Sequence, residues 1–125
     1  MAITVLIIDD AVHIRRLVAR MLVQAGFNTL EAADGLQGLQ ILTDQKPDIV
    51  TCDLSMPHMN GYEFLLAAKE NPETQDIPII VLTAIGQEEE ATKATEMGAD
   101  GYVTKPFSSN HLFETIYAQL EKYSQ

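Results

Sequence analysis

The chain has 125 residues, of which 46% are hydrophobic and 21% charged, and its formal net charge is -10. This length suits one domain with a single core, and the composition is that of a folded protein rather than a disordered one. The strong negative charge argues against a broad surface that binds the phosphate backbone of nucleic acids.

The single cysteine, Cys52, excludes an intramolecular disulfide, and its place in an apolar run predicts a packed core thiol. The apolar start, Ile3 to Ile8, is too short for a secretory signal or a membrane span. We therefore expect a cytoplasmic protein without membrane insertion, forming one domain over residues 1–125 with nothing attached. One local cluster of positive charge is interpreted as a solvated helix face rather than a nucleic-acid patch: Arg15, Arg16 and Arg20.

Five short apolar runs alternate with helical patterns of about 10 to 15 residues, as expected for βα units with right-handed crossovers. The predicted strands are Thr4–Ile8, Thr29–Ala32, Ile49–Cys52, Ile79–Leu82 and Gly101–Thr104. In the first helix, apolar residues recur at spacings of three and four, and Gly26 is a plausible residue just after its end. That stripe comprises Ile14, Leu17, Val18, Met21, Leu22 and Ala25.

The strands differ in a way that predicts their order. The first, third and fourth are almost continuously apolar, as strands covered on both faces must be, whereas the second and fifth carry polar residues that suit sheet edges. This favours an α/β, doubly wound parallel sheet with the order 2-1-3-4-5 and helices on both faces. In that order the chain changes direction between the first and third strands, so a ligand crevice is expected there.

Carboxylates end the two strands that flank this crevice. Asp9 and Asp10 follow the first strand, and Asp53 follows the third. Three like charges so close repel one another unless a cation lies between them. Oxygen ligands without cysteine or histidine favour a hard cation such as Mg²⁺, which prefers one or two carboxylates plus phosphate oxygens. The alternative for the first pair is that Asp10 merely caps the following helix.

The two remaining strand ends supply complementary groups. Thr83 ends the fourth strand with a hydroxyl donor, and Lys105 follows the fifth strand with an ammonium group. Around a phosphoryl group on Asp53, these groups would share the equatorial oxygens with Mg²⁺. The sequence therefore predicts phosphoryl transfer with Asp53 as the nucleophile.

Together these motifs resemble the response-regulator receiver domains of two-component signalling, over the whole chain and with the flavodoxin-like fold of CheY. The motifs are Asp9-Asp10, Asp53 with Met56-Pro57 and Asn60-Gly61, Thr83-Ala84, Gly98-Ala99-Asp100-Gly101-Tyr102 and Lys105-Pro106-Phe107. The strand order 2-1-3-4-5 is also the one known for that fold.

The resemblance implies a role for each matching position. Asp53 would accept a phosphoryl group from a histidine kinase or a small donor such as acetyl phosphate. Asp10 and Asp53 would bind Mg²⁺ (or Mn²⁺) directly, Asp9 through water, and Ser55 through its main-chain carbonyl. Lys105 would pair with Asp53 or its phosphate, and the Lys105-Pro106 peptide would be cis, which X-Pro bonds reach at low cost.

The resemblance also implies a conformational switch formed by Thr83 and Tyr102. On phosphorylation the Thr83 hydroxyl would move toward the phosphoryl oxygens, and the Tyr102 ring would turn inward. Ser55 and Ile85 occupy the positions that tune the phosphoryl lifetime, and a branched Ile85 is expected to hinder the attacking water. The fourth helix, about Gln87 to Met97, has a thin apolar stripe, so we predict that it moves most on activation.

The predicted function is that of a CheY-like response regulator, which is no enzyme beyond its own phosphorylation and slow autodephosphorylation. Its expected partners are a sensor histidine kinase or phosphotransfer protein, and a protein target on the face of the fourth helix, fifth strand and fifth helix. Alternatives are a receiver cut from a larger regulator and a phosphorylation-independent docking module. A flavodoxin is disfavoured, because it would need a hydroxyl- and glycine-rich phosphate loop in place of Asp9-Asp10. A phosphatase of the haloacid-dehalogenase type is disfavoured, because it would need a second aspartate at the position of Ser55.

Overall fold

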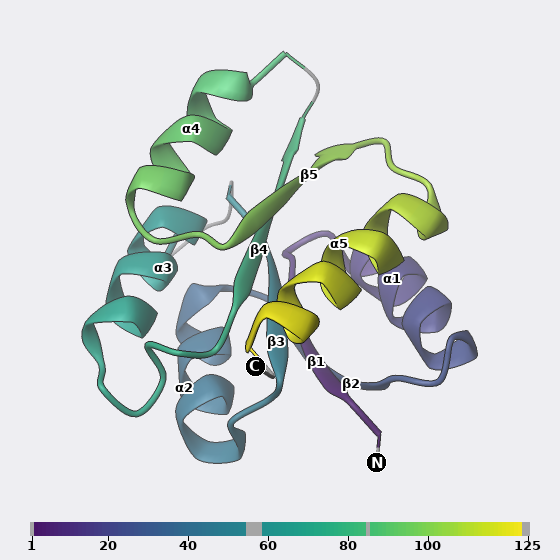
Figure 1. Cartoon of the computed structure of the whole chain (residues 1–125), viewed down its shortest axis with the longest axis horizontal. Coiled ribbons are helices and arrows are strands. Elements are labelled where there is room, and N and C mark those ends of the chain that lie inside the picture. The colour runs from purple at the N-terminus through teal and green to yellow at the C-terminus, as the bar shows by residue number, and fades with distance from the viewer. Residues whose placement is uncertain (1, 55–58, 85, 124–125) are drawn as a thin grey trace.

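A computed structural model describes residues 2–54, 59–84 and 86–123 of the chain. Within these residues, parallel strands alternate with helices along the chain (Figure 1). The elements are β1 (Thr4–Ile8), α1 (Val12–Gln24), β2 (Asn28–Ala32), α2 (Gly35–Gln45), β3 (Ile49–Asp53), α3 (Gly61–Glu70), β4 (Ile79–Ala84), α4 (Glu88–Glu96), β5 (Gly101–Lys105) and α5 (Ser109–Tyr123). In the part of the chain described, no helix is both long and apolar enough to cross a bilayer.

The sheet has the order β2-β1-β3-β4-β5, which confirms the predicted order and places β2 and β5 at its edges. Three strands extend one or two residues beyond their predicted ends, so that Asp53, Ala84 and Lys105 are the last residues of β3, β4 and β5. Asp53 pairs with Leu82 of β4, and Ala84 pairs with Lys105 of β5. The parallel register thus brings the polar strand ends to one edge of the sheet.

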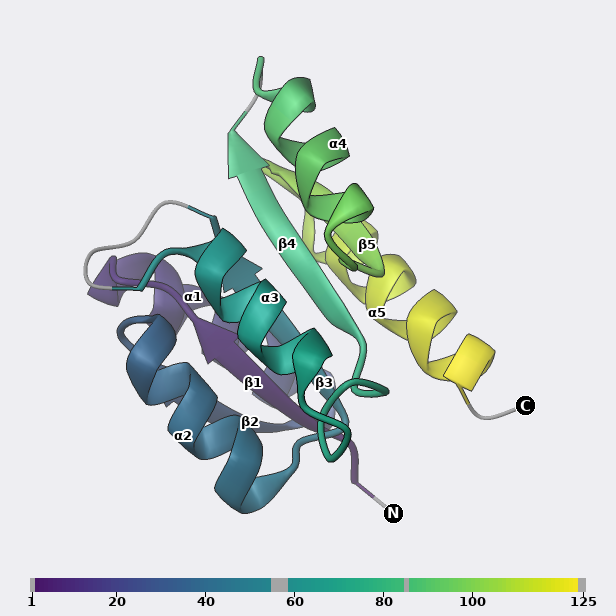
Figure 2. The ribbon, with the colours of Figure 1, turned by 90° about the vertical axis from the view of Figure 1, so that its left-hand side faces the viewer.

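Helices cover both faces of the sheet: α2, α3 and α4 lie on one side, and α1 and α5 on the other (Figures 1 and 2). Successive residues of each strand point to opposite faces, so each central strand contributes to two cores. The core under α2, α3 and α4 includes Leu6, Ile8, Val50, Cys52, Ile79, Val81, Leu42, Phe64, Leu65 and Ala94. The core under α1 and α5 includes Val5, Ile7, Ile49, Ile80, Leu82, Val103, Val18, Leu22, Leu112 and Ile116.

Local sequence signals fix two helix boundaries. At the end of α1, Gly26 adopts φ +98°, and the Phe27 N–H donates to the carbonyl of Leu22. This is a Schellman ending, which confirms the predicted place of Gly26. At the start of α3, Asn60 and Glu63 form a capping box in which each side chain accepts from the other's backbone N–H.

The buried face of α1 differs from the predicted stripe. Val18 and Leu22 are buried as expected, but Leu17 is 53% exposed, and Ala19 is buried instead. The helix is therefore turned so that Arg15, three residues before Val18, lies on the inward face rather than in solvent. The prediction of a solvated arginine cluster is wrong for this residue, whose side chain is 12% exposed.

The helix α4 is held by few apolar contacts, as predicted from its thin stripe. Only Ala91 and Ala94 are buried in it, and its N-cap residue Gln87 makes no side-chain capping bond. Two small side chains bury little apolar area, so their burial stabilises the docked helix weakly.

Candidate functional site

Three carboxylates converge where β1 and β3 end. Carboxylate oxygens of Asp9, Asp10 and Asp53 all lie within 4.8 Å of one another. The adjacent strands produce this arrangement, because Ile8 of β1 pairs with Cys52 of β3 and each strand then delivers its aspartate. Together they form a three-carboxylate oxygen cluster of the kind that hard divalent cations prefer.

The ammonium group of Lys105 lies between two of these carboxylates. Its Nζ is 3.4 Å from Asp9 Oδ2 and 3.5 Å from Asp53 Oδ2. The Lys105-Pro106 peptide bond that follows is cis, as the resemblance implies. Three carboxylates and one ammonium carry a formal charge of about −2. A single divalent cation would neutralise that charge, so the donor set fits Mg²⁺ or Mn²⁺ in both atom type and charge.

The three aspartates differ in their surroundings. Asp9 is 1% exposed, and its Oδ1 accepts a hydrogen bond of 2.9 Å from the Ala11 N–H. Asp10 is exposed, and Asp53 lies between these extremes. Asp10 does not cap α1, because the N-cap residue is Ala11, which rules out the capping alternative in this structure. The neighbouring carboxylates of Asp9 and Asp10 therefore differ in their access to solvent.

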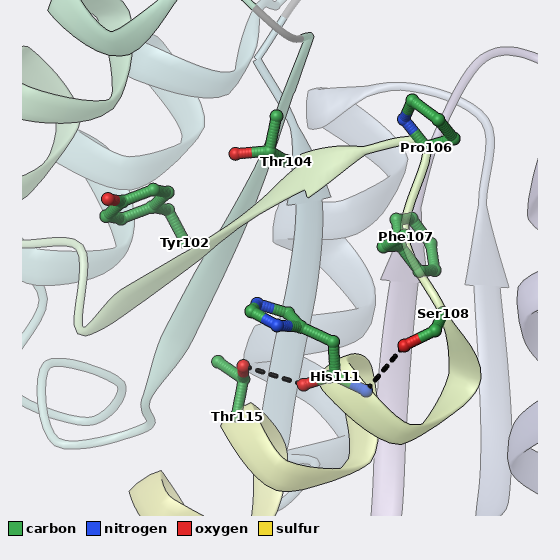
Figure 3. Close-up of a pocket in the computed structure, with 7 residues that line it drawn as sticks. All are labelled: Tyr102, Thr104, Pro106, Phe107, Ser108, His111 and Thr115. Atoms are coloured by element: carbon green, nitrogen blue, oxygen red, sulfur yellow. Dashed lines mark hydrogen bonds between the residues drawn. The ribbon is translucent and has the colours of Figure 1, made fainter.

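Thr83 and Tyr102, the residues of the predicted switch, lie on neighbouring strands. Thr83 is 5% exposed near the end of β4, and Tyr102 on the edge strand β5 is 50% exposed. Figure 3 shows the Tyr102 ring projecting from β5 at the rim of a pocket between β5 and α5. The tyrosine thus has its ring turned outward while the threonine is enclosed.

Other predicted site residues fall outside the part of the chain that the structure describes. These are Ser55, with its predicted metal-ligating carbonyl, and Ile85, with its predicted effect on the attacking water. Cys52, next to Asp53, is buried as predicted. Burial, together with the neighbouring Asp53 and Asp9 carboxylates, raises the pKa of its thiol far above the ordinary value, so the thiol is inert at neutral pH.

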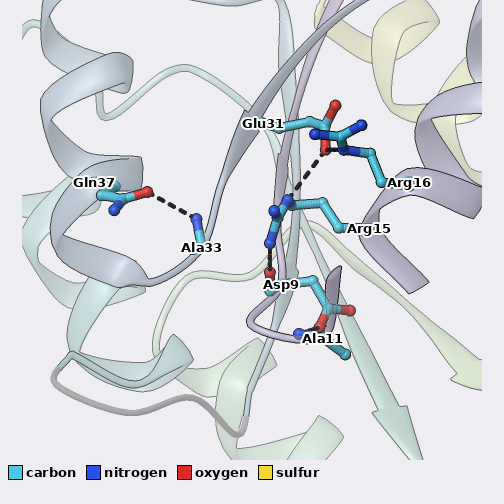
Figure 4. Close-up of polar contacts among 7 residues, drawn as sticks. All are labelled: Asp9, Ala11, Arg15, Arg16, Glu31, Ala33 and Gln37. Atoms are coloured by element: carbon cyan, nitrogen blue, oxygen red, sulfur yellow. Dashed lines mark hydrogen bonds and ion pairs between the residues drawn. The ribbon is translucent and has the colours of Figure 1, made fainter. Parts of the chain in front are cut away.

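The sequence did not predict a contact between α1 and the backbone of the acidic cluster. Arg15 donates from Nη1 to the main-chain carbonyl of Asp9 at 2.8 Å and from Nε to Glu31 at 3.1 Å (Figure 4). A signal for it was present, since Arg15, Val18 and Leu22 follow the i, i+3, i+7 pattern of one helix face. A charged residue on such a face indicates a buried polar partner.

Residues 5–117 match the response regulator receiver domain. The chain belongs to this family. Receiver domains are signalling domains of two-component systems rather than conventional enzymes, and CheY-like structures share the fold described above.

Similar proteins include both transcriptional regulators and isolated receivers. The chain is 40% identical over 119 residues to the phosphate regulon transcriptional regulatory protein PhoB of Pseudomonas aeruginosa, covering 95% of this chain and 52% of that protein. It is 34% identical to the DNA-binding dual master transcriptional regulator RpaA of Synechocystis, covering 94% of this chain and 49% of RpaA. The receiver thus spans about half the length of these curated relatives.

Solved structures support the same assignment. Chemotaxis protein CheY4 of Vibrio cholerae superposes with a TM-score of 0.88 at 31% identity, covering 94% of this chain and 98% of CheY4. The receiver domain of NtrX from Brucella abortus also gives a TM-score of 0.88, at 29% identity, covering 94% of this chain and 98% of that one.

Proposed function

We propose that this receiver accepts a phosphoryl group on the Asp53 carboxylate. The observation that carries the proposal is the position of the Lys105 ammonium, 3.5 Å from Asp53 within a cluster of three carboxylates. A strand-end carboxylate beside a fixed cation and a candidate metal site suits phosphoryl transfer by positioning and charge neutralisation.

Burial favours Asp53 over Asp9 as the nucleophile. The Asp53 side chain is 16% exposed, whereas that of Asp9 is 1% exposed and is engaged by the Ala11 N–H. In the transfer, an Asp53 oxygen attacks phosphorus and forms a new P–O bond. The P–N bond of a phosphohistidine, or the P–O bond of acetyl phosphate, breaks, and the leaving imidazole or acetate keeps the electron pair.

A divalent cation, Mg²⁺ or Mn²⁺, would be held by Asp10 and Asp53 directly and by Asp9 through water, with the Ser55 carbonyl as a further ligand. When bound, the cation supplies charge neutralisation at the phosphoryl oxygens and the attacking carboxylate. The support for this assignment is the set of carboxylate oxygens within 4.8 Å and their residual negative charge. Lys105 neutralises part of the charge that develops on the phosphoryl group.

The conformational response is proposed to involve Thr83 and Tyr102. The Thr83 hydroxyl would donate to a phosphoryl oxygen, and the Tyr102 ring would turn inward from its half-exposed position. The weakly held helix α4 and the segment after β4, which includes Ile85, would move with them. Ser55 and Ile85 remain proposed determinants of the phosphoryl lifetime.

The proposed partners are a sensor histidine kinase or phosphotransfer protein that supplies the phosphoryl group, and a protein target. The target would bind the face formed by α4, β5 and α5, where Tyr102, Thr104 and His111 line the pocket of Figure 3. The net charge of -10 opposes direct binding of this receiver to nucleic acid. A cytoplasmic location remains our expectation, and a receiver within a longer regulator remains the alternative arrangement.

Intact-mass spectrometry after incubation with acetyl phosphate tests the proposal. We expect native protein to gain one phosphoryl group only when Mg²⁺ is present, and the Asp53→Asn variant to gain none. Asp76→Asn is the matched control, because Asp76 is exposed and remote from the cluster in sequence. Phosphorylation that persists in Asp53→Asn would assign the acceptor elsewhere. If native protein gains no mass from acetyl phosphate or from a phosphorylated histidine kinase, a docking module is the better description.

A further inference from the structure

Arg15 is held by two contacts that tie α1 to both β1 and β2. Its Nη1 lies 2.8 Å from the Asp9 carbonyl oxygen and its Nε lies 3.1 Å from Glu31 Oε1, with the side chain only 12% exposed. Figure 4 shows the guanidinium between these two acceptors. The planar fork of arginine can donate in two directions at once, which the single ammonium group of lysine does less well.

The contact with Asp9 fixes the backbone from which the acidic pair projects. The Asp9 N–H already donates to the Ala32 carbonyl of β2 at 3.1 Å, and Arg15 engages the carbonyl on the other side of the residue. The Asp9 carbonyl and the Asp10 N–H belong to one planar peptide unit. Holding that carbonyl therefore orients the peptide from which the exposed Asp10 carboxylate projects.

The geometry points to Arg15 as a positioning residue for divalent-cation binding, acting through the Asp9-Asp10 peptide. This inference rests on the proposed function, because it concerns the cation that Asp10 and Asp53 are proposed to hold. A charge-assisted hydrogen bond of 2.8 Å to a neutral carbonyl is stronger than one from a neutral donor. Its loss would leave the Asp10 carboxylate free to sample orientations that do not meet the cation.

A comparison of Arg15 with Arg16 distinguishes positioning of the Asp9-Asp10 peptide from ion pairing with Glu31. Its Nε is also 3.1 Å from Glu31 Oε1, but its side chain is 70% exposed. Glu31 therefore keeps a cationic partner when Arg15 is removed. The contact that distinguishes Arg15 from Arg16 is the hydrogen bond to the Asp9 carbonyl, so Arg16 is a matched control with the same charge and the same carboxylate partner.

The test measures Mn²⁺ affinity from the EPR signal of free Mn²⁺, well below the melting temperature of each variant found by circular dichroism. We expect Arg15→Met to bind Mn²⁺ about 10-fold more weakly than native protein, at the lower end of the effect for partners of ligating groups. We expect Arg16→Met to stay within about 2-fold of native, because an exposed surface charge contributes little. Arg15→Lys should restore part of the affinity.

Repeating the titration in 0.5 M KCl distinguishes positioning from charge. A long-range charge effect fades at high salt, whereas an effect of peptide orientation persists. If Arg15→Met and Arg16→Met weaken Mn²⁺ binding equally, or if the loss disappears in KCl, the inference is wrong.

Failure of the proposed metal site gives a different result. If native protein binds no Mn²⁺, or if Asp53→Asn binds Mn²⁺ as tightly as native protein does, both the proposed metal site and this inference are refuted. Native protein that binds Mn²⁺ while Arg15→Met binds it equally well would overturn the inference alone. If Arg15→Met does not fold, Arg15→Lys carries the test: weaker Mn²⁺ binding than native at both salt concentrations would support the inference, and an affinity equal to native would overturn it.

Discussion

Replacing Gly61 by alanine should destabilise the protein, although the sequence alone predicts the opposite. Glycine is a poor helix former, so alanine at the first position of α3 would ordinarily be neutral or stabilising. In the folded chain, however, Gly61 packs directly against the end of β3. A β-carbon built there would lie 2.6 Å from the Asp53 carbonyl oxygen and 2.6 Å from Leu54 Cα.

The size of the effect follows from these contacts. Non-bonded carbon atoms rest about 3.5 to 4.0 Å apart, so α3 or the end of β3 must shift by about 1 Å. Both obstructing atoms belong to the backbone, which cannot change rotamer to relieve the clash. Overpacking of this kind costs about 1 to 3 kcal/mol, and the gain in helix propensity offsets at most about 1 kcal/mol. Because both obstructing atoms are backbone, the cost should lie at the upper end of that range, and we expect a net loss of about 2 kcal/mol.

Urea denaturation of Gly61→Ala measures this loss. With a slope of about 2 kcal/mol/M, the midpoint should fall by about 1 M. The control is Gly101→Ala, where an added β-carbon meets its nearest neighbours at 3.4 Å from Gln119 Nε2 and 3.5 Å from Thr115 Cγ2, so stability should change little. A Gly61→Ala midpoint equal to or above native would refute the reasoning, because it would mean that the junction of β3 and α3 adjusts freely.

Three further predictions concern ion pairing, thiol reactivity and helix docking. Lys69→Met should cost about 3 kcal/mol in urea denaturation, because it removes an ammonium that pairs with the largely buried Asp100 at 2.9 Å and donates to the Gln75 and Ile77 carbonyls, while Asp100 keeps the Ile79 N–H. The exposed Arg16→Met should cost under about 0.5 kcal/mol, and equal costs would contradict this prediction. Cys52 should resist iodoacetamide at pH 8.5 in native protein and react once urea unfolds it, because its raised pKa keeps the thiol protonated; rapid native labelling would refute the burial argument. Hydrogen exchange of backbone amides should be faster in α4 than in α1. Tyr62→Phe should accelerate exchange in α4 about 5-fold, because it removes a hydrogen bond of about 1 kcal/mol from the tyrosine hydroxyl to the Glu90 carbonyl. Equal protection of the two helices would disprove the prediction.

The strand order and the meeting of polar strand ends at one edge of the sheet could be predicted from the sequence alone. Continuous apolar runs mark strands covered on both faces, and polar residues mark edge strands, so the order of the sheet could be inferred before any contact was known. Because parallel strands end at one edge, the residues at the ends of β1, β3 and β5 had to meet, and Asp9, Asp53 and Lys105 do so. These inferences need only periodicity and topology.

The contacts that hold the site in place could not be predicted from the sequence. Arg15 and Lys69 donate to main-chain carbonyls, and every residue carries a carbonyl, so no pattern of residue types identifies the acceptor. The close approach of Gly61 to the end of β3 depends on the distance between α3 and the sheet. The rotation of α1 that buries Arg15 and exposes Leu17 depends on packing against β1 and β2, because an apolar stripe alone fixes a helix face only to within a residue or two.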